Sequence, residues 1–370
     1  MMGKALSLLM SLTLIATLLS STVRAATPPS GTVIITTSTV WPEGTYGLVS
    51  LTITNGATLS VAGGTILSVS GGVTVTGNST ILLQGKNTAA QVAGQWQGAG
   101  VTINAGNITV EAGSKISADG QGYVGGAGPG SGNIDSYMGI GSGGGYGGQG
   151  GASAHGGASG GTLYGSSTVP VDPGSGGGGA GTGGSGGGSI RLNVSGTLTL
   201  SGVISANGAA GANTPCSIGG GGGGSGGSIL VTVGVIAGSG LFTANGGAGG
   251  IGGCTSTGDD GGGGGGGRIA VNYAAGQSFS GLSISTANGG GGINAGQHGT
   301  AAFINTTDNH LTVSGQAFTL GEDSVVNYTA ITAENGAMVT IGGGSTVNVT
   351  GDLTVTGNST ILLQGKNTAA

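Results

Sequence analysis

The stretch from Gly186 to Gly292 decides the fold, because one pattern is written there three times. Each copy opens with a glycine run and an alternating apolar segment: SIRLNV from Ser189, SILVTV from Ser228 and RIAVNY from Arg268. A repeat of about 40 residues is typical of stacked units that bury their apolar faces only against one another. A second short apolar segment closes each copy in Ala-Asn-Gly, with the asparagines Asn207, Asn245 and Asn288.

Composition points to an all-β chain. Glycine supplies 94 of 370 residues, whereas charged residues make up 5% and aromatic residues 4%. Valine, isoleucine and threonine alternate in short runs, and after the N-terminal segment no stretch has apolar residues at helical spacing. The net charge of −5, with 7 basic residues in all, gives no electrostatic footprint for nucleic acid.

Plain alternating strands lie on both sides of the repeats, from Gly31 to about Gly85 and again after His298. In the first region, turns of glycine or asparagine recur about every 8 to 10 residues and part short strands, such as TILSVS from Thr65 and VTVT from Val73. This spacing suits a sandwich and a solenoid equally, and the near-identical strands without long crossovers favour the solenoid. We therefore expect an all-β fold, a right-handed β-helix whose turns carry inserted glycine-rich modules.

Two further blocks complete the chain order. The segment from Val101 to Gly120 has the two-segment form of the repeats but ends in Ala-Asp-Gly, so we interpret it as a fourth module. Trp41, Pro42 and Tyr46 predict a cap over the open edge of the first turn. The expected order is a signal peptide at 1–25, a β-region at 26–120, a glycine-rich insertion at 121–188, three modules at 189–299 and a second β-region at 300–370.

The first residues predict export. Lys4 is followed by an almost wholly apolar run from Ala5 to Leu19, and small residues precede a cleavage position at Ala25 or Ala26. This is the pattern of a secretory signal peptide, and no later stretch has the apolar length of a membrane helix. We expect the mature chain to carry no membrane span.

The glycine-rich insertion allows two interpretations. One is a flexible linker. The other is a set of glycine strands packed side by side as extended left-handed helices with three residues per turn, similar to polyglycine II. The second arrangement needs many shared backbone hydrogen bonds, because ordering glycine has a high entropic cost.

The chain also carries a long duplication. Residues 74–90 and 354–370 are the same 17-residue sequence, TVTGNSTILLQGKNTAA. Looser similarity precedes both copies, with TITNGA at 52–57 against TAENGA at 332–337. We interpret this as a recent duplication of a unit about 280 residues long, and expect the chain to be a truncated part of a longer tandem array.

The two cysteines occupy equivalent positions in neighbouring modules. Cys216 lies nine residues after Asn207, and Cys254 lies nine residues after Asn245. Stacking of the modules would bring the two cysteines together, and in an exported protein such a pair predicts a disulfide.

Groups for catalysis or metal binding are scarce. The 3 histidines show no ligand spacing, and the GGxGxDxUx calcium pattern is missing. The 12 acidic residues form no recognisable pair for glycosidic or lyase chemistry. GxGxxG matches in 219–227 follow from composition alone. We therefore predict no catalytic residue, no metal site, no cofactor and no enzyme activity.

With its signal segment, its NGATLSVAGGTILSVSGG opening at 55–72 and its glycine-punctuated strands, the chain resembles bacterial surface β-helix proteins of the filamentous-haemagglutinin and autotransporter-passenger kind. The resemblance implies a secreted or surface-displayed structural and adhesive repeat protein. Its partners would be carbohydrates or another cell surface, with self-association as a further option. The alternatives are a carbohydrate-active β-helix enzyme, a lyase or hydrolase, and an ice- or crystal-binding protein that uses a flat threonine face.

Overall fold

The computed structural model describes residues 29–136, 138–154, 157–179, 183–215, 218–253 and 259–366. No α-helix occurs in these ranges, and a short 3-10 turn, η3, spans Leu282–Ile284. The strands are β1 (Gly31–Ile35), β2 (Thr39–Trp41), β3 (Thr45–Ile53), β4 (Thr58–Val61), β5 (Ile66–Val75), β6 (Thr80–Leu83), β7 (Val101–Val110), β8 (Lys115–Ser117), β9 (Ser189–Leu200), β10 (Val203–Ser205), β11 (Ser228–Gly238), β12 (Leu241–Thr243), β13 (Arg268–Phe279), β14 (Thr300–Asn305), β15 (His310–Ser314), β16 (Ala317–Leu320), β17 (Val325–Tyr328), β18 (Ala330–Glu334), β19 (Met338–Ile341), β20 (Thr346–Val349), β21 (Leu353–Val355) and β22 (Thr360–Leu363).

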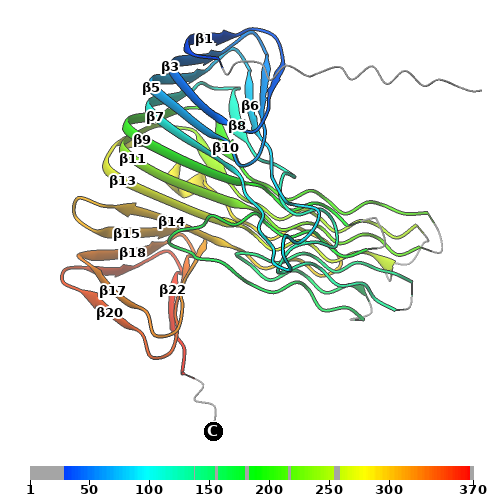
Figure 1. Cartoon of the computed structure of the whole chain (residues 1–370). Coiled ribbons are helices and arrows are strands. Elements are labelled where there is room, and N and C mark those ends of the chain that lie inside the picture. The colour runs from blue at the N-terminus through cyan, green and yellow to red at the C-terminus, as the bar shows by residue number, and fades with distance from the viewer. Residues whose placement is uncertain are drawn as a thin grey trace, which may run out of the picture.

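The strands form long parallel sheets, and from β1 to β13 every second strand of the chain is a neighbour. One sheet runs β1-β3-β5-β7-β9-β11-β13-β14-β15-β18-β21, and another runs β2-β4-β6-β8-β10-β12. Within the described ranges, all pairings between these strands are parallel except that of β14 with β15. Figure 1 shows the first sheet as a stack that follows chain order from β1 to β14. The prediction of an all-β fold is confirmed.

The glycine segments are excursions from otherwise uniform turns. Leu51 of β3 pairs with Val73 of β5, 22 positions on, whereas Val101 of β7 pairs with Ile190 of β9, 89 positions on. The extra residues lie between the short strand of one turn and the long strand of the next, that is between β8 and β9, β10 and β11, and β12 and β13. In Figure 1 these excursions reach out together on one side of the stack.

Two hydrophobic cores lie on opposite faces of β14. The first extends from Trp41 of β2 to Phe303 of β14, and the second begins at Ala302 of the same strand. Ala301 and Phe303 face the first core, whereas Ala302 and Ile304 face the second. Alternate residues of a strand point to opposite faces, so β14 is covered on both sides. The core therefore changes sides of the continuous sheet where the antiparallel β14–β15 pair begins.

A ladder of side chains holds the start of each excursion. Asn207 N–H donates to Asp119 Oδ1 (2.7 Å), Asn245 N–H to Asn207 Oδ1 (2.8 Å), and Asn288 N–H to Asn245 Oδ1 (2.7 Å). The four residues are the central Asn or Asp of each Ala-Asn-Gly or Ala-Asp-Gly motif. The side chains of Asp119, Asn207 and Asn245 each satisfy a backbone donor of the next turn that no strand ladder pairs.

Backbone hydrogen bonds order the glycine excursions without making strands. The backbone N–H groups of six consecutive residues, 222–227, donate in turn to carbonyl oxygens of three neighbouring segments. The same order of segments repeats after three residues. The bonds run from Gly222 to Gly178, Gly223 to Gly262, Gly224 to Ala209, Ser225 to Ser175, Gly226 to Gly265 and Gly227 to Ala206. A segment with this period has partners on several sides and is not a flexible linker.

Glycine is required because neighbouring backbones touch. A Cβ on Gly222 would lie 1.9 Å from Ser142 O, and a Cβ on Gly264 would lie 2.0 Å from Gly224 O. Real Cβ atoms do not approach backbone so closely. The missing side chains therefore permit the dense hydrogen bonding.

Three local expectations need correction or fall outside the described ranges. Trp41 and Tyr46 are buried and stack within the first core, 5.0 Å between ring centroids, so they do not cap the edge of β1. The segments TILSVS and VTVT form one strand, β5, because the glycines between them make a bulge and not a turn. The signal segment, Cys216 and Cys254 lie outside the described residues.

Candidate binding groove

A groove of about 720 Å³ crosses successive turns of the large sheet. It follows the line where the long strands carry register shifts, between Leu48 and Leu51 of β3 and between Ala105 and Ile108 of β7. Bulges bend each strand at the same level, and aligned bends leave a trough along the stack. None of its lining residues is acidic or basic; they are Gly31, Gly47, Leu48, Val49, Ser68, Val69, Ser70, Asn104, Ala105, Gly106, Asn193, Val194, Ser195 and Thr232.

A row of polar side chains lines this groove, one from each turn. Ser68, Asn104, Asn193 and Thr232 occupy paired positions on β5, β7, β9 and β11. Asn193 Nδ2 donates to Asn104 Oδ1 (2.8 Å), and Asn104 Nδ2 donates to Ser68 Oγ (3.3 Å). These bonds fix the orientation of both amides and leave further donors and acceptors for a ligand. We call these four residues the amide row.

A second row consists of threonines on the neighbouring face of the same strands. Thr52, Thr74, Thr109 and Thr199 pair successively across β3, β5, β7 and β9. Their strand neighbours Ile53, Val75 and Val110 are buried in the first core, so the threonines face outward. We call these four residues the threonine row.

A buried arginine joins the long insertion to β13. Arg268 is 6% exposed; its Nε and Nη2 donate to Tyr164 O (3.1 and 2.9 Å), and Nη2 also donates to Tyr146 O (3.4 Å). Its guanidinium carbon lies 5.3 Å from the centre of the Tyr146 ring, a cation–π distance. No carboxylate within the described ranges forms an ion pair with it.

Burial governs titration in this cluster. It raises the pKa of the Tyr146 and Tyr164 phenols, and the Arg268 charge partly opposes the rise at Tyr146. It also lowers the pKa of Arg268 and raises the pKa of Asp172. Tyr146 Oη lies 2.6 Å from Ser228 Oγ, and Tyr164 Oη donates to Pro173 O (2.6 Å). The cluster is packed and hydrogen-bonded, which indicates a structural role.

The remaining charged and imidazole groups are dispersed. His298 Nδ1 lies 3.1 Å from Asn288 Oδ1, and His310 Nε2 lies 2.8 Å from Thr332 Oγ1. Asp260 Oδ1 accepts a hydrogen bond from Gly252 N–H (2.9 Å). In the part of the chain that the structure describes, no three His, Cys, Asp or Glu side chains gather as a metal site. Within the same ranges no helix is long and apolar enough to cross a membrane.

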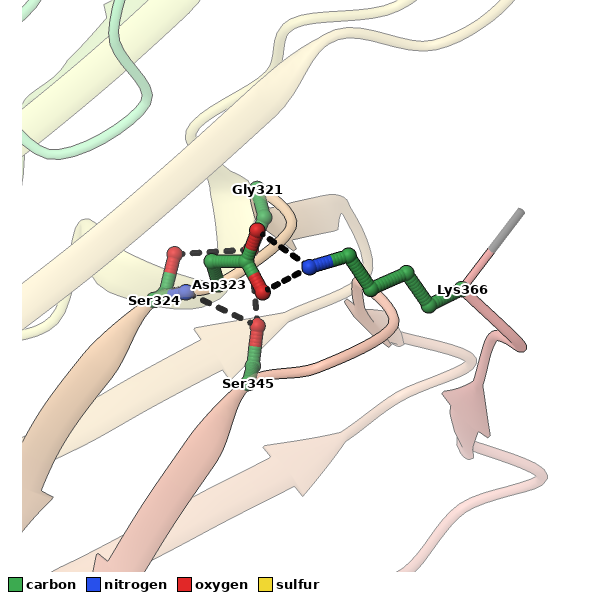
Figure 2. A network of polar contacts seen from close by, with 5 residues as sticks. All are labelled: Gly321, Asp323, Ser324, Ser345 and Lys366. Atoms are coloured by element: carbon green, nitrogen blue, oxygen red, sulfur yellow. Dashed lines mark hydrogen bonds and ion pairs between the residues drawn. The ribbon is translucent and has the colours of Figure 1, made fainter. Parts of the chain in front are cut away.

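An ion pair recurs in both copies of the duplicated sequence. Lys366 Nζ lies 2.7 Å from Asp323 Oδ1, and Ser324 N–H donates to Ser345 Oγ beside it, as Figure 2 shows. Lys86 Nζ makes the same contact with Glu43 Oε1 at 2.5 Å. The two pairs hold equivalent turns together and lie away from the groove.

Comparison of the chain with protein-family models, with curated proteins and with solved structures finds no match.

Two features of the site are not evident, or only partly evident, in the sequence. The sequence indicates part of the amide row, because Asn193 and Thr232 both occupy the fifth position of their repeats, SIRLNV and SILVTV. Asn104 joins them only through a pairing 89 positions long, which no period in the sequence indicates. The partners of Arg268 lie 104 and 122 residues away in the insertion, where glycine hides any pattern.

Proposed function

We propose that this chain is a secreted or surface-displayed structural and adhesive protein of a bacterium. It is a right-handed β-helix whose excursions pack as a polyglycine II-like bundle, and it makes weak repeated contacts with glycans or with a surface. In architecture and role the chain would resemble filamentous-haemagglutinin and autotransporter-passenger proteins. Parallel pairing of every second strand from β1 to β13 supports the β-helix, and the three-residue hydrogen-bond cycle supports the polyglycine arrangement.

The amide row is the observation that carries the adhesive function. Its side chains repeat once per turn along a groove with no charged lining, so an extended neutral polymer lying in the groove would meet similar donors and acceptors at each turn. Individual hydrogen bonds of this kind contribute only about 0.5–1.5 kcal/mol, and repetition along one polymer raises the overall affinity. The absence of acidic lining residues in this groove argues against the rival lyase or hydrolase, which needs paired carboxylates.

The test is retention of the purified chain on a panel of immobilised neutral polysaccharides. The double variant Asn104→Ala/Asn193→Ala is expected to bind roughly tenfold more weakly, because two or more hydrogen bonds are lost per chain. Thr197→Ala, on the same strand as Asn193 but outside the groove and the threonine row, is the matched control and should bind as the parent does. Unchanged retention of the double variant, or no retention of the parent on any polysaccharide, would refute the adhesive role of the groove.

The threonine row favours crystal-surface binding as a second candidate. Four hydroxyls at the strand repeat form a regular line, as an ice-binding face requires. Thermal hysteresis of the purified chain, reduced by Thr109→Leu and unaffected by Asn193→Ala, would support it. A freezing point equal to the melting point would end it.

A further inference from the structure

Part of the Arg268 guanidinium has no partner among the described residues. Its Nε and Nη2 donate to the carbonyl oxygens of Tyr164 and Tyr146, whereas Nη1 makes no hydrogen bond within the described ranges. Although Arg268 as a whole is buried, Nη1 is not enclosed by protein atoms. The guanidinium is therefore fixed along one edge by the insertion, and the two N–H donors of Nη1 face open space.

The open space beside Arg268 is a pocket of about 370 Å³ between the insertion and the second β-region. Residues 165–168 of the insertion form one wall. The other wall consists of residues of β16, of β17 and of the turn between them: Thr319, Leu320, Gly321, Ser324 and Val326. Ser167 Oγ donates to Thr319 O (2.6 Å), which joins the two walls. A ligand in this pocket would therefore contact parts of the chain that lie 152 residues apart.

The charge in the wall of this pocket is positive. Among the described residues Arg268 is the one charged residue of the lining. The charge of Asp172 reaches Arg268, but Asp172 forms no ion pair with it and lies outside the lining. Asp323, in the turn beside Ser324, is ion-paired with Lys366, as Figure 2 shows, and it too lies outside the lining. An anion in the pocket would thus meet a buried guanidinium and no carboxylate in the wall.

A hydroxyl in the insertion wall supplies a further donor. Ser166 Oγ accepts hydrogen bonds from the N–H groups of Thr168 (3.3 Å) and Val169 (3.1 Å), and it lies 3.2 Å from Thr168 Oγ1. Because Ser166 Oγ already accepts twice, its own proton is donated to Thr168 Oγ1. The Thr168 hydroxyl proton then has no acceptor within the described ranges, and it is free for a ligand.

We propose that this pocket binds an oxoanion group, a sulfate or a carboxylate, through Nη1 of Arg268 and the Thr168 hydroxyl. Guanidinium N–H groups match the oxygens of such groups, and charge-assisted hydrogen bonds are about twice as strong as neutral ones. Pockets for small organic ligands measure about 300–1,000 Å³, so this one has room for a saccharide unit that carries the group as well as for the free ion. The pocket and the groove share no lining residue, so the proposal does not rest on the adhesive function of the groove.

The experiment is a calorimetric titration of the purified chain with sodium sulfate, sodium glucuronate and neutral glucose at constant ionic strength. We expect saturable binding of an anion with a Kd of about 1 mM or tighter, and no binding of glucose. Binding of sulfate alone supports the site and assigns it to an inorganic ion, and binding of glucuronate supports it and assigns it to an acidic saccharide. Saturable binding of neither anion up to about 50 mM, or equal binding of glucose and glucuronate, would overturn the proposal.

Variants separate this pocket from other positive charge on the chain. Arg268→Gln should abolish anion binding, and Thr168→Val, which keeps the shape of the side chain, should weaken it roughly tenfold because a hydrogen bond to a charged group is lost. Arg191→Gln is the matched control, since it removes the same charge from an exposed arginine of β9 outside the pocket, and it should bind as the parent does. Circular dichroism equal to the parent's checks folding, and Thr168→Val decides the matter if Arg268→Gln unfolds. Binding unchanged in a folded pocket variant, or lost equally in Arg191→Gln, would refute the assignment.

Discussion

Lys366 and Asp323 form the same ion pair as Lys86 and Glu43, the two residues numbered 280 lower. The backbone repeats at the same distance in sequence. Gly64 and Gly344, which lie beside the two pairs, have φ of 81° and 77°, and Asn55 and Asn335 have φ of 62° and 57°. The duplication inferred from the 17 identical residues is therefore also a duplication of local structure, including positions where the letters differ, such as Glu43 and Asp323.

We expect the ladder of Asp119, Asn207, Asn245 and Asn288 to contribute to the free energy of unfolding. Replacing Asn245 by Ala removes the acceptor of Asn288 N–H, a backbone donor near the core. We expect a loss of about 1–3 kcal/mol in the free energy of unfolding, seen in denaturant titration. Asn272→Ala is the control, because Asn272 faces away from the core beside Val271. Equal stability of both variants would show that the ladder contributes nothing.

Packing in the glycine bundle should reject even one methyl group. Gly264→Ala would place Cβ 2.0 Å from Gly224 O, so we expect destabilisation of about 1–3 kcal/mol or more, measured by thermal unfolding. Gly291→Ala is the matched control, because a Cβ there meets nothing within 4 Å. Similar melting temperatures for the two variants would argue that the excursions are loosely packed.

High pH should unfold the protein through its buried tyrosines. Burial raises the pKa of Tyr146 and Tyr164 above the ordinary value of 10.0. Between that value and the folded pKa, the unfolded chain binds fewer protons than the folded chain, so stability is lost as pH rises. We expect phenolate absorbance of these residues to appear only together with loss of the β-sheet circular dichroism signal. Full phenolate formation near pH 10 in a folded chain would contradict it.

The all-β fold was predictable and its turns were not. Alternating segments such as SILVTV predict a strand directly, and Val231 and Val233 are buried as the pattern predicts. The change of sides at β14 was hidden, because AAFI in TAAFIN has no alternation when both faces are buried. Whether the glycine tracts are ordered was also hidden, since it depends on contacts between segments and not on any local preference.

The disulfide stays a prediction, now with support from its neighbours. Thr214 N–H donates to Ile251 O (3.0 Å), and Asn213 Oδ1 accepts from Ile251 N–H (2.8 Å), so the residues before Cys216 and Cys254 stack in register. We expect no thiol alkylation of the denatured chain without reductant. The double variant Cys216→Ser/Cys254→Ser should lose roughly 3–4 kcal/mol of stability in the chain-entropy account. Two alkylated thiols in the exported protein would exclude the bond.

Amide hydrogen exchange across residues 219–227 tests the central claim, that the excursions form an ordered bundle which stiffens the stack. Gly222, Gly223 and Gly224 each donate to a different segment, so their amides should exchange as slowly as those of the flanking strands β9 and β11. Exchange at the rate of an unstructured glycine peptide, with β9 and β11 still protected, would contradict the account and return these segments to flexible linkers.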